Sequence, residues 1–171
     1  MSMQSNSPSS PIVAVERQIT INAGSEAVFA YVADLRNDSE WRAEINRTSL
    51  DAALPAPGVL ATEDAFLSTK RPNSITRLAY EAYEPSRFMR CLTTVDNTSW
   101  MSVERTFRPI GPTTTEFIYN LQFEQKVVRE ALGFAPPLWF LRWYSGWMMM
   151  KYLRKLKSIL EARQAVVTST H

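Results

Sequence analysis

The segment Ile19–Trp41, ITINAGSEAVFAYVADLRNDSEW, gives the strongest indication of the fold. It starts in an alternating apolar and polar run over residues 12–21, a pattern that predicts a half-buried β-strand. Ser25 is a plausible helix N-cap after a turn of small residues, and Glu26 suits the first helical turn. The helix should end near Asp34. The polar residues 36–41 then indicate a turn or a second short helix that leads to Trp41.

The middle of the chain predicts a series of β-strands separated by turns. Runs rich in β-branched and aromatic residues alternate with Pro, Gly, Asn and Ser. The clearest strand is residues 113–124, where alternate positions place Phe117 and Tyr119 on one apolar face. Strands that are joined by turns of a few residues must be antiparallel. The expected strands are residues 43–51, 59–68, 74–83, 88–95, 100–107 and 113–124.

The end of the chain predicts one long helix, from Pro137 to about Arg163, because its apolar residues recur at helical spacing. Its first half, through Met150, is apolar nearly all round, so we expect it to be covered on most sides. The order of elements predicts an α+β fold in which an antiparallel sheet curls around a helix and leaves an apolar hollow. We expect a single domain over residues 12–164, a disordered tail over 1–11 and a flexible tail over 165–171.

Composition excludes several classes of protein. Apolar content of 45% and charged content of 21% are ordinary for a globular domain, and a net charge of +2 gives no argument for nucleic acid binding. The charge is uneven, because Arg142–Arg163 carries six basic residues and one acidic residue. Cys91 is the only cysteine, which suits a reducing compartment. The first eleven residues do not resemble a signal peptide, and no run reaches the roughly 18 apolar residues of a membrane span. We therefore expect a cytoplasmic protein.

The inventory of reactive residues argues against metal, nucleophilic and phosphate-binding sites. The only histidine is His171, at the end of the chain, and Cys91 has no second cysteine beside it. A zinc site or a nucleophile with a histidine base is therefore not expected. Neither GxGxxG nor GxxxxGK[ST] occurs, so the sequence predicts no cofactor.

Strand parity supplies candidate residues for a binding or catalytic site. Tyr119 should point inward with Phe117, while Arg105 shares a face with apolar neighbours, as does Arg90. An arginine in a pocket can orient a carboxylate, an enolate or a carbonyl group. The alternative interpretation is that each arginine is salt-bridged on a partly exposed strand and that Tyr119 is a core residue.

Four segments carry a resemblance to a known superfamily: Ile19–Trp41, AYEAYEPSRFMR (79–90), RTFRPIGPTTTEFIYNLQF (105–123) and YLRKLKSILEA (152–162). In their order and spacing, the chain resembles the SRPBCC (START/Bet v1-like) superfamily, in particular its polyketide cyclase/dehydrase-like branch. The resemblance implies a helix-grip fold, in which a seven-stranded antiparallel sheet wraps around the C-terminal helix and two short helices follow the first strand. It also implies a tunnel for hydrophobic ligands such as lipids, sterols or polyketides.

Two functions are consistent with these features. The first is binding, and through it transport or sequestration, of a hydrophobic small molecule such as a lipid. The second is a polyketide cyclase or dehydratase that moves protons through Arg105, Tyr119 or a carboxylate such as Asp64. The absence of an internal histidine favours binding. We expect the cavity to be lined by Trp41, Arg90, Trp100, Arg105, Phe117, Tyr119, Trp143, Trp147 and Met150.

A weaker third interpretation concerns the basic residues from Lys151 to Lys157. They are most simply a solvated helix face. Together with Trp147 and Tyr144 they also fit transient contact with an anionic membrane, as in a membrane-adjacent or regulatory adaptor. The sequence is also compatible with a homodimer.

Overall fold

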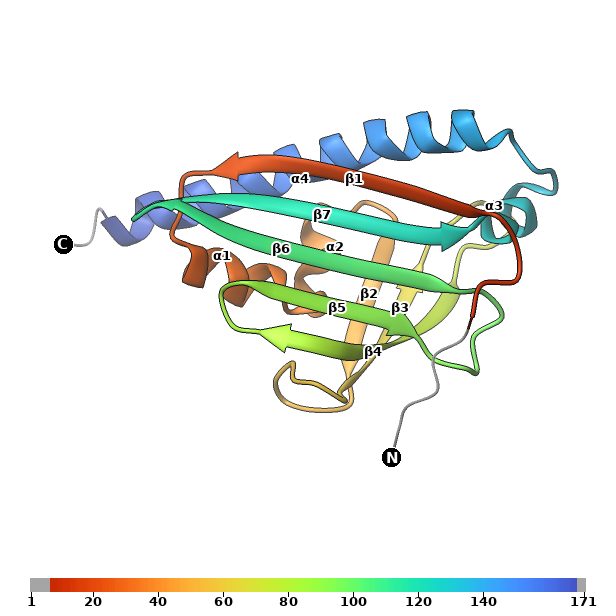
Figure 1. Ribbon diagram of the computed structural model, residues 1–171, viewed down its shortest axis with the longest axis horizontal. Coiled ribbons are helices and arrows are strands. Elements are labelled where there is room, and N and C mark those ends of the chain that lie inside the picture. Colours follow the sequence, from red (N-terminus) through yellow and green to blue (C-terminus); the bar gives the residue numbers. More distant parts are fainter. Residues whose placement is uncertain (1–6, 169–171) are drawn as a thin grey trace.

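The computed structural model describes residues 7–168 and contains a curved antiparallel sheet with one long helix along it (Figure 1). The helix-grip α+β architecture expected from the sequence is confirmed. The sheet has seven strands in the order β1-β7-β6-β5-β4-β3-β2. The elements are β1 (Ile12–Ile21), α1 (Ser25–Val32), the 3₁₀ helix η1 (Leu35–Asn37), α2 (Asp38–Trp41), β2 (Ile45–Leu50), β3 (Leu60–Ala65), β4 (Ser74–Glu84), β5 (Phe88–Thr93), β6 (Met101–Gly111), β7 (Thr114–Glu124), α3 (Gln125–Leu132) and α4 (Leu138–Thr168).

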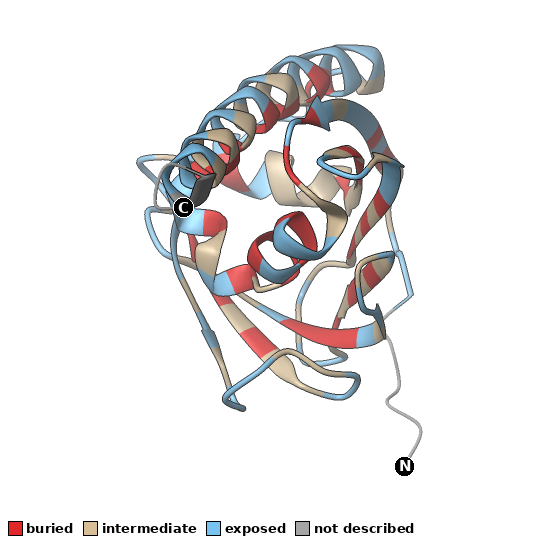
Figure 2. Cartoon of the chain, turned by 90° about the vertical axis from the view of Figure 1, so that its left-hand side faces the viewer, coloured by how far each residue is buried: buried red, intermediate tan, exposed pale blue. Residues whose placement is uncertain are grey.

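The sheet is a meander that is closed by a long-range pairing. Strands β2 to β7 follow one another as antiparallel neighbours, whereas β1 pairs with β7, so that Ile12 lies opposite Glu124 and Ile21 opposite Thr115. Figure 2 shows the curved sheet from one end, with α4 running along its open side. Ser25, expected as an N-cap, is the first residue of α1, and Gly24 is the N-cap.

The core lies between the concave face of the sheet, α1 and one stripe of α4. Leu153 and Leu156 of α4 are fully buried, and Val13 of β1 and Val28 of α1 belong to the same apolar cluster. The expectation that the first half of α4 is covered on most sides is wrong. This half rests on the sheet along one stripe only, so its other aromatic side chains face solvent.

Arg17 interrupts the apolar face of β1, and its place is explained by Gly146 of α4. A Cβ atom at position 146 would lie 2.2 Å from Nη2 of Arg17, so the guanidinium group occupies the space that a side chain would need. Glycine therefore allows the strand and the helix to approach with the arginine between them.

The first described residues are held to the sheet by the buried carboxylate of Glu124. Its Oε1 accepts from the backbone N–H of Ser9 (2.6 Å) and Ser10 (2.8 Å), and its Oε2 from that of Trp100 (2.6 Å). Burial alone would raise the pKa of Glu124, but these donors outweigh it and lower the pKa to about 2. Residues 1–6 and 169–171 of the two expected tails lie outside the described residues, and α4 extends to Thr168.

Glu124→Gln is expected to destabilise the fold by about 1–3 kcal/mol, because hydrogen bonds to a charged acceptor are lost. The stability contributed by the native carboxylate is present above its ordinary pKa of 4.5 and is lost as the pH falls towards about 2. Denaturant unfolding at several pH values should therefore show that the free energy of unfolding falls less steeply with decreasing pH in the variant than in wild type. Glu116→Gln on the same strand, which only breaks the exposed pair with Arg108, should cost less than about 1 kcal/mol.

Candidate functional site

A cavity of about 540 Å³ lies between the concave face of the sheet and the helices α3 and α4. Its body is largely apolar. Strand alternation turns Leu121 and Phe123 of β7 towards it, α3 contributes Val128, and α4 contributes Met148 and Met149. The volume falls within the usual range of about 300–1,000 Å³ for small-molecule sites.

Polar side chains from several elements converge on one part of this cavity. Alternation along β3 directs Glu63 inward between Ala61 and Ala65. Arg42 is the C-cap of α2, and Glu44 precedes β2, so the turn between the two elements brings both side chains to the same place. The polar residues here are Arg42, Glu44, Glu63, Tyr119 and Tyr152.

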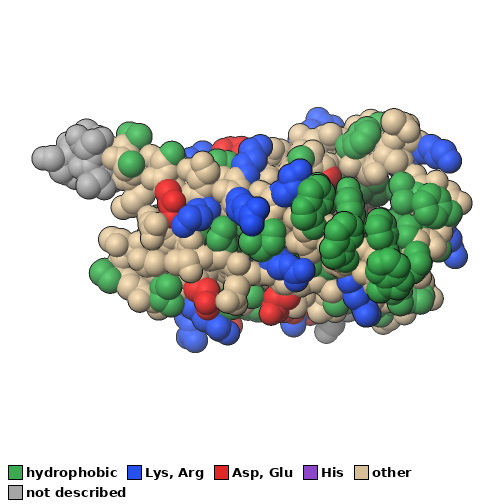
Figure 3. Space-filling model, turned by 90° about the horizontal axis from the view of Figure 1, so that it is seen from above, with side chains coloured by type: hydrophobic (Ala, Val, Ile, Leu, Met, Phe, Trp, Pro, Cys, Tyr) green, Lys and Arg blue, Asp and Glu red, His purple; other side chains and the backbone are tan. Residues whose placement is uncertain are grey.

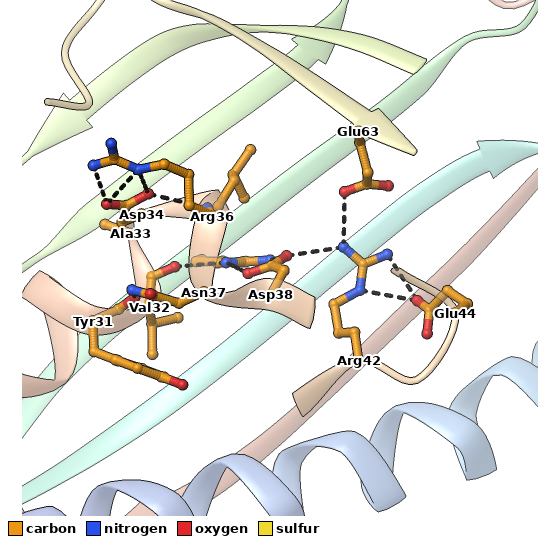
Figure 4. A network of polar contacts seen from close by, with 12 residues as sticks. Tyr31, Val32, Ala33, Asp34, Arg36, Asn37, Asp38, Arg42, Glu44 and Glu63 are labelled. Carbon is orange, nitrogen blue, oxygen red and sulfur yellow. Dashed lines mark hydrogen bonds and ion pairs between the residues drawn. The ribbon is translucent and has the colours of Figure 1, made fainter. Parts of the chain in front are cut away.

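Arg42 is the centre of a buried ion-pair network (Figure 4). Its Nη1 lies 3.0 Å from Asp38 Oδ2 and 3.3 Å from Glu63 Oε2, and its Nη2 lies 2.8 Å from Glu44 Oε1. Asp38 also binds Arg105, whose Nη1 donates to Asp38 Oδ1 (2.9 Å) and to the backbone carbonyl of Val32 (2.6 Å). The guanidinium of Arg42 is thus paired with three carboxylates of the protein itself.

The charges in this network do not balance when every group is ionised, because two arginines face three carboxylates. Within this network the pKa of Glu63 is shifted. Burial raises the pKa of Glu63 above its ordinary value of 4.5, although the Arg42 guanidinium opposes the shift. A carboxyl group with a raised pKa in a cavity is suited to exchange a proton with a ligand.

Tyr119 is a second polar residue of the cavity lining. Its side chain is almost fully buried, and its hydroxyl has no hydrogen-bond partner among the described residues. Burial raises the pKa of the phenol, although Arg42 opposes this, so the hydroxyl stays protonated as a donor. Trp41 meets the Tyr119 ring edge-on at 5.9 Å, and the Arg105 guanidinium lies 5.0 Å from the centre of that ring. These contacts fix the ring in place.

The family model described as polyketide cyclase / dehydrase and lipid transport matches residues 13–161. The chain belongs to this family. A comparison with curated proteins gives no match.

Solved structures from the same superfamily share the fold. A START superfamily protein from Mycobacterium smegmatis superposes with a TM-score of 0.69 at 16% identity, over 87% of this chain and 97% of that one. The Zhui aromatase/cyclase from Streptomyces sp. R1128 gives 0.62 at 12% identity, over 90% and 96%. The di-domain ARO/CYC StfQ from the steffimycin biosynthetic pathway gives 0.64 at 14% identity, over 90% of this chain and 52% of that one. At these identities the fold alone is shared.

In this member of the polyketide cyclase/dehydrase and lipid transport family, two of the site residues predicted from sequence line the cavity, Trp100 and Tyr119. Trp41, Arg105 and Phe117 are fully buried next to Tyr119 and form the packed layer that supports it. They position the site without lining it.

The remaining predicted residues lie away from the cavity. Arg90 lies on the opposite face of β5 from the buried Met89, in ion pairs with Glu81 (2.6 Å) and Glu104 (3.6 Å). Asp64 accepts hydrogen bonds from Asn46 and Asn73 and does not line the cavity. In α4, Met150 packs against the core, and Trp143 and Trp147 are exposed to solvent.

Two further properties of the described residues concern metals and membranes. No group of three or more histidine, cysteine or acidic side chains is arranged to hold a metal ion in residues 7–168. Within the same range, no helix is long and apolar enough to cross a membrane.

Glu63→Gln is expected to stabilise the protein at neutral pH by about 1 kcal/mol, because it removes the surplus buried charge while Arg42 keeps two carboxylate partners. Since the native state holds the Glu63 proton more tightly than the unfolded state, wild-type stability should decrease as the pH rises above 4.5 and through the raised pKa. Chemical unfolding between pH 4 and 8 measures this slope. If the free energy of unfolding changed with pH in the same way in wild type and in Glu63→Gln, the raised pKa of Glu63 would be contradicted.

Proposed function

We propose that the protein binds a hydrophobic small molecule with one polar end, such as a lipid or a polyketide-like compound, in the cavity between sheet and α4. One observation carries this proposal: a largely apolar cavity of about 540 Å³ is lined by Tyr119, whose buried phenol hydroxyl has no partner among the described residues. Buried polar groups are seldom left unsatisfied, so a ligand oxygen is a natural acceptor for this hydroxyl. Transport or sequestration of the ligand follows from such binding.

The ion-pair network restricts the polar end of the ligand. Arg42 is already paired with Asp38, Glu44 and Glu63, so its positive charge is compensated before a ligand carboxylate could reach it. A further anion would also meet the surplus negative charge of these carboxylates. We therefore infer a neutral polar end, such as a hydroxyl, ketone or ester group, that accepts a hydrogen bond from Tyr119.

Competition for the cavity tests this proposal directly. The neutral dye Nile red serves as the fluorescent probe, displaced by a fatty alcohol or by the fatty acid of the same chain length. The alcohol is expected to displace the dye at about tenfold lower concentration, because the acid must bury a second unpaired charge or take up a proton. Equal potency of the two, or tighter binding of the acid, would refute a neutral polar end.

Two variants locate the binding within the cavity. Leu121→Trp should abolish dye binding by filling the space, while Tyr119→Phe should keep dye binding and weaken the alcohol about tenfold. Ile110→Ala, at an exposed position that does not line the cavity, is the matched control and should change neither. Native mass spectrometry of protein from its source cells, with extraction of the bound compound, then identifies the natural ligand.

The second candidate function is that of a cyclase or dehydratase in the same cavity. Glu63, with its raised pKa, and the protonated Tyr119 hydroxyl lie in one cavity, as an acid–base pair would. A reactive poly-β-ketone thioester is the suitable test substrate. If the protein is an enzyme, Glu63→Gln and Tyr119→Phe should each lower kcat by about 10²–10⁴-fold. Binding of the substrate without turnover by wild type would favour the carrier function.

A further inference from the structure

Five aromatic side chains form a continuous surface on the first half of α4, and we call this surface the α4 aromatic patch. Trp139 is 71% exposed, Trp143 61% and Trp147 50%. Neighbouring rings are in contact along the helix, with centroid distances of 6.0 Å for Trp139–Phe140, 6.2 Å for Phe140–Tyr144 and 6.0 Å for Tyr144–Trp147. Figure 3 shows apolar side chains gathered over this part of the molecule.

The α4 aromatic patch has an apolar extension at the adjoining end of α3. Leu132, the last residue of α3, and Phe134 in the following loop are also exposed. Large aromatic side chains bury more apolar area than any others, so exposing this many together is costly in water. A continuous apolar surface of this kind marks an interaction site.

Within α4, the charged residues in and beside the aromatic patch are all basic. Helix α4 contains no aspartate or glutamate before Glu161, and its basic residues begin within the patch itself. The ammonium group of Lys151 lies 4.6 Å from the ring centre of Trp147. Figure 3 shows Lys and Arg side chains next to the apolar area. The basic residues before Glu161 are Arg142, Lys151, Arg154, Lys155 and Lys157.

We propose that the α4 aromatic patch docks on the surface of a membrane that contains anionic lipid. Trp and Tyr place an apolar ring in the acyl boundary and a polar group among the headgroups. The surrounding lysines and arginines are attracted by the negative surface potential of such a membrane. The patch lies on the outward face of α4, and the acidic side chain of this helix, Glu161, lies well beyond it in sequence, which fits a flat anionic surface.

Docking at this place puts the membrane next to the wall of the cavity. Tyr144 belongs to the α4 aromatic patch and also lines the cavity, as do the following residues Ser145 and Met148. A ligand exchanged between bilayer and cavity would then pass along the side of α4. This second step rests on the proposed binding function, whereas the docking itself does not.

Co-sedimentation with lipid vesicles tests the docking. Wild type should bind vesicles of phosphatidylcholine with phosphatidylglycerol and should bind pure phosphatidylcholine at least tenfold more weakly. The double variant Trp139→Ala, Trp143→Ala should reduce the partition coefficient on anionic vesicles at least tenfold. Lys151→Gln with Lys155→Gln should reduce it about tenfold on anionic vesicles only, and raising the salt concentration should reproduce that loss.

A matched control separates the patch from apolar exposure in general. Leu54 is 73% exposed in the loop between β2 and β3, which lies across the molecule from α4 (Figure 1). Leu54→Ala should leave vesicle binding unchanged, and circular dichroism confirms that every variant is folded. Nile red binding without vesicles should be the same in wild type and in the Trp139, Trp143 variant, so failure of docking is distinguished from failure of the binding function.

Two results would overturn the proposal. The first is wild-type protein that stays in the supernatant at all lipid concentrations. The second is a dimer in analytical ultracentrifugation that dissociates when Trp139 and Trp143 are replaced and that does not bind vesicles, since the patch would then be an interface between two copies of the chain.

Discussion

Arg105→Met is expected to lower the free energy of unfolding by about 3–5 kcal/mol, because it leaves a buried carboxylate without its principal partner. Arg105 is fully buried and binds both carboxylate oxygens of Asp38. It also satisfies the backbone carbonyl of Val32, at the end of α1. In the variant, Arg42 is the remaining partner of three carboxylates. The loss of stability should therefore be greatest at the junction between α1, η1 and α2.

Urea unfolding monitored by circular dichroism measures this loss. Arg105→Lys keeps the charge but cannot form the bidentate pair, and should lie between wild type and Arg105→Met. Arg90→Met on the neighbouring strand breaks exposed ion pairs only and should cost less than about 1 kcal/mol. If Arg105→Met and Arg90→Met were equally stable, the buried pair would not have the structural role assigned to it.

Trp41→Ala is expected to cost about 3–5 kcal/mol and to loosen the site, because the side chain is fully buried. The indole is in contact with Tyr119, and the Arg105 guanidinium lies 5.1 Å from its ring centre. Removing it leaves a void behind Tyr119. Since that ring then loses its support, affinity for the ligand should fall as well as stability.

Trp41→Phe separates these two effects, because it keeps an aromatic contact with Tyr119 and should retain most of the stability. Thermal unfolding gives the stability, and Nile red titration below the unfolding transition gives the affinity. An unchanged dissociation constant in Trp41→Ala protein that is still folded would show that Trp41 does not position Tyr119.

Much of the fold was predictable because periodicity reports which face of an element is buried. Residues 114–124 alternate so regularly that strand β7 was predicted within one residue. Helix α3 was missed, because Gln125 follows β7 directly and no proline or glycine separates the two elements. Gly133, with a φ of 87°, ends α3 in the left-handed conformation, and this glycine was the available sign of a helix terminus.

The site was less predictable, because its charges come from parts of the chain that periodicity does not connect. The buried face of Arg105 followed from its strand, but its partner Asp38 lies in a short helix far away in sequence. On β3, Asp64 was the predicted carboxylate, whereas Glu63 is the one that lines the cavity; a shift of one residue along a strand exchanges the two faces. Arg42 belongs to a turn, where no period applies.

The pairing of β1 with β7 affects how the protein is made in the cell. Ile12 leaves the ribosome long before Glu124, its partner in the sheet, has been synthesised. At a synthesis rate of about 5–20 residues per second, β1 remains unpaired for on the order of ten seconds, during which β2 to β7 can form their local hairpins. We therefore expect the first strand to be the last to join the sheet, and a chaperone that holds this strand would assist biogenesis more than one that acts on the meander.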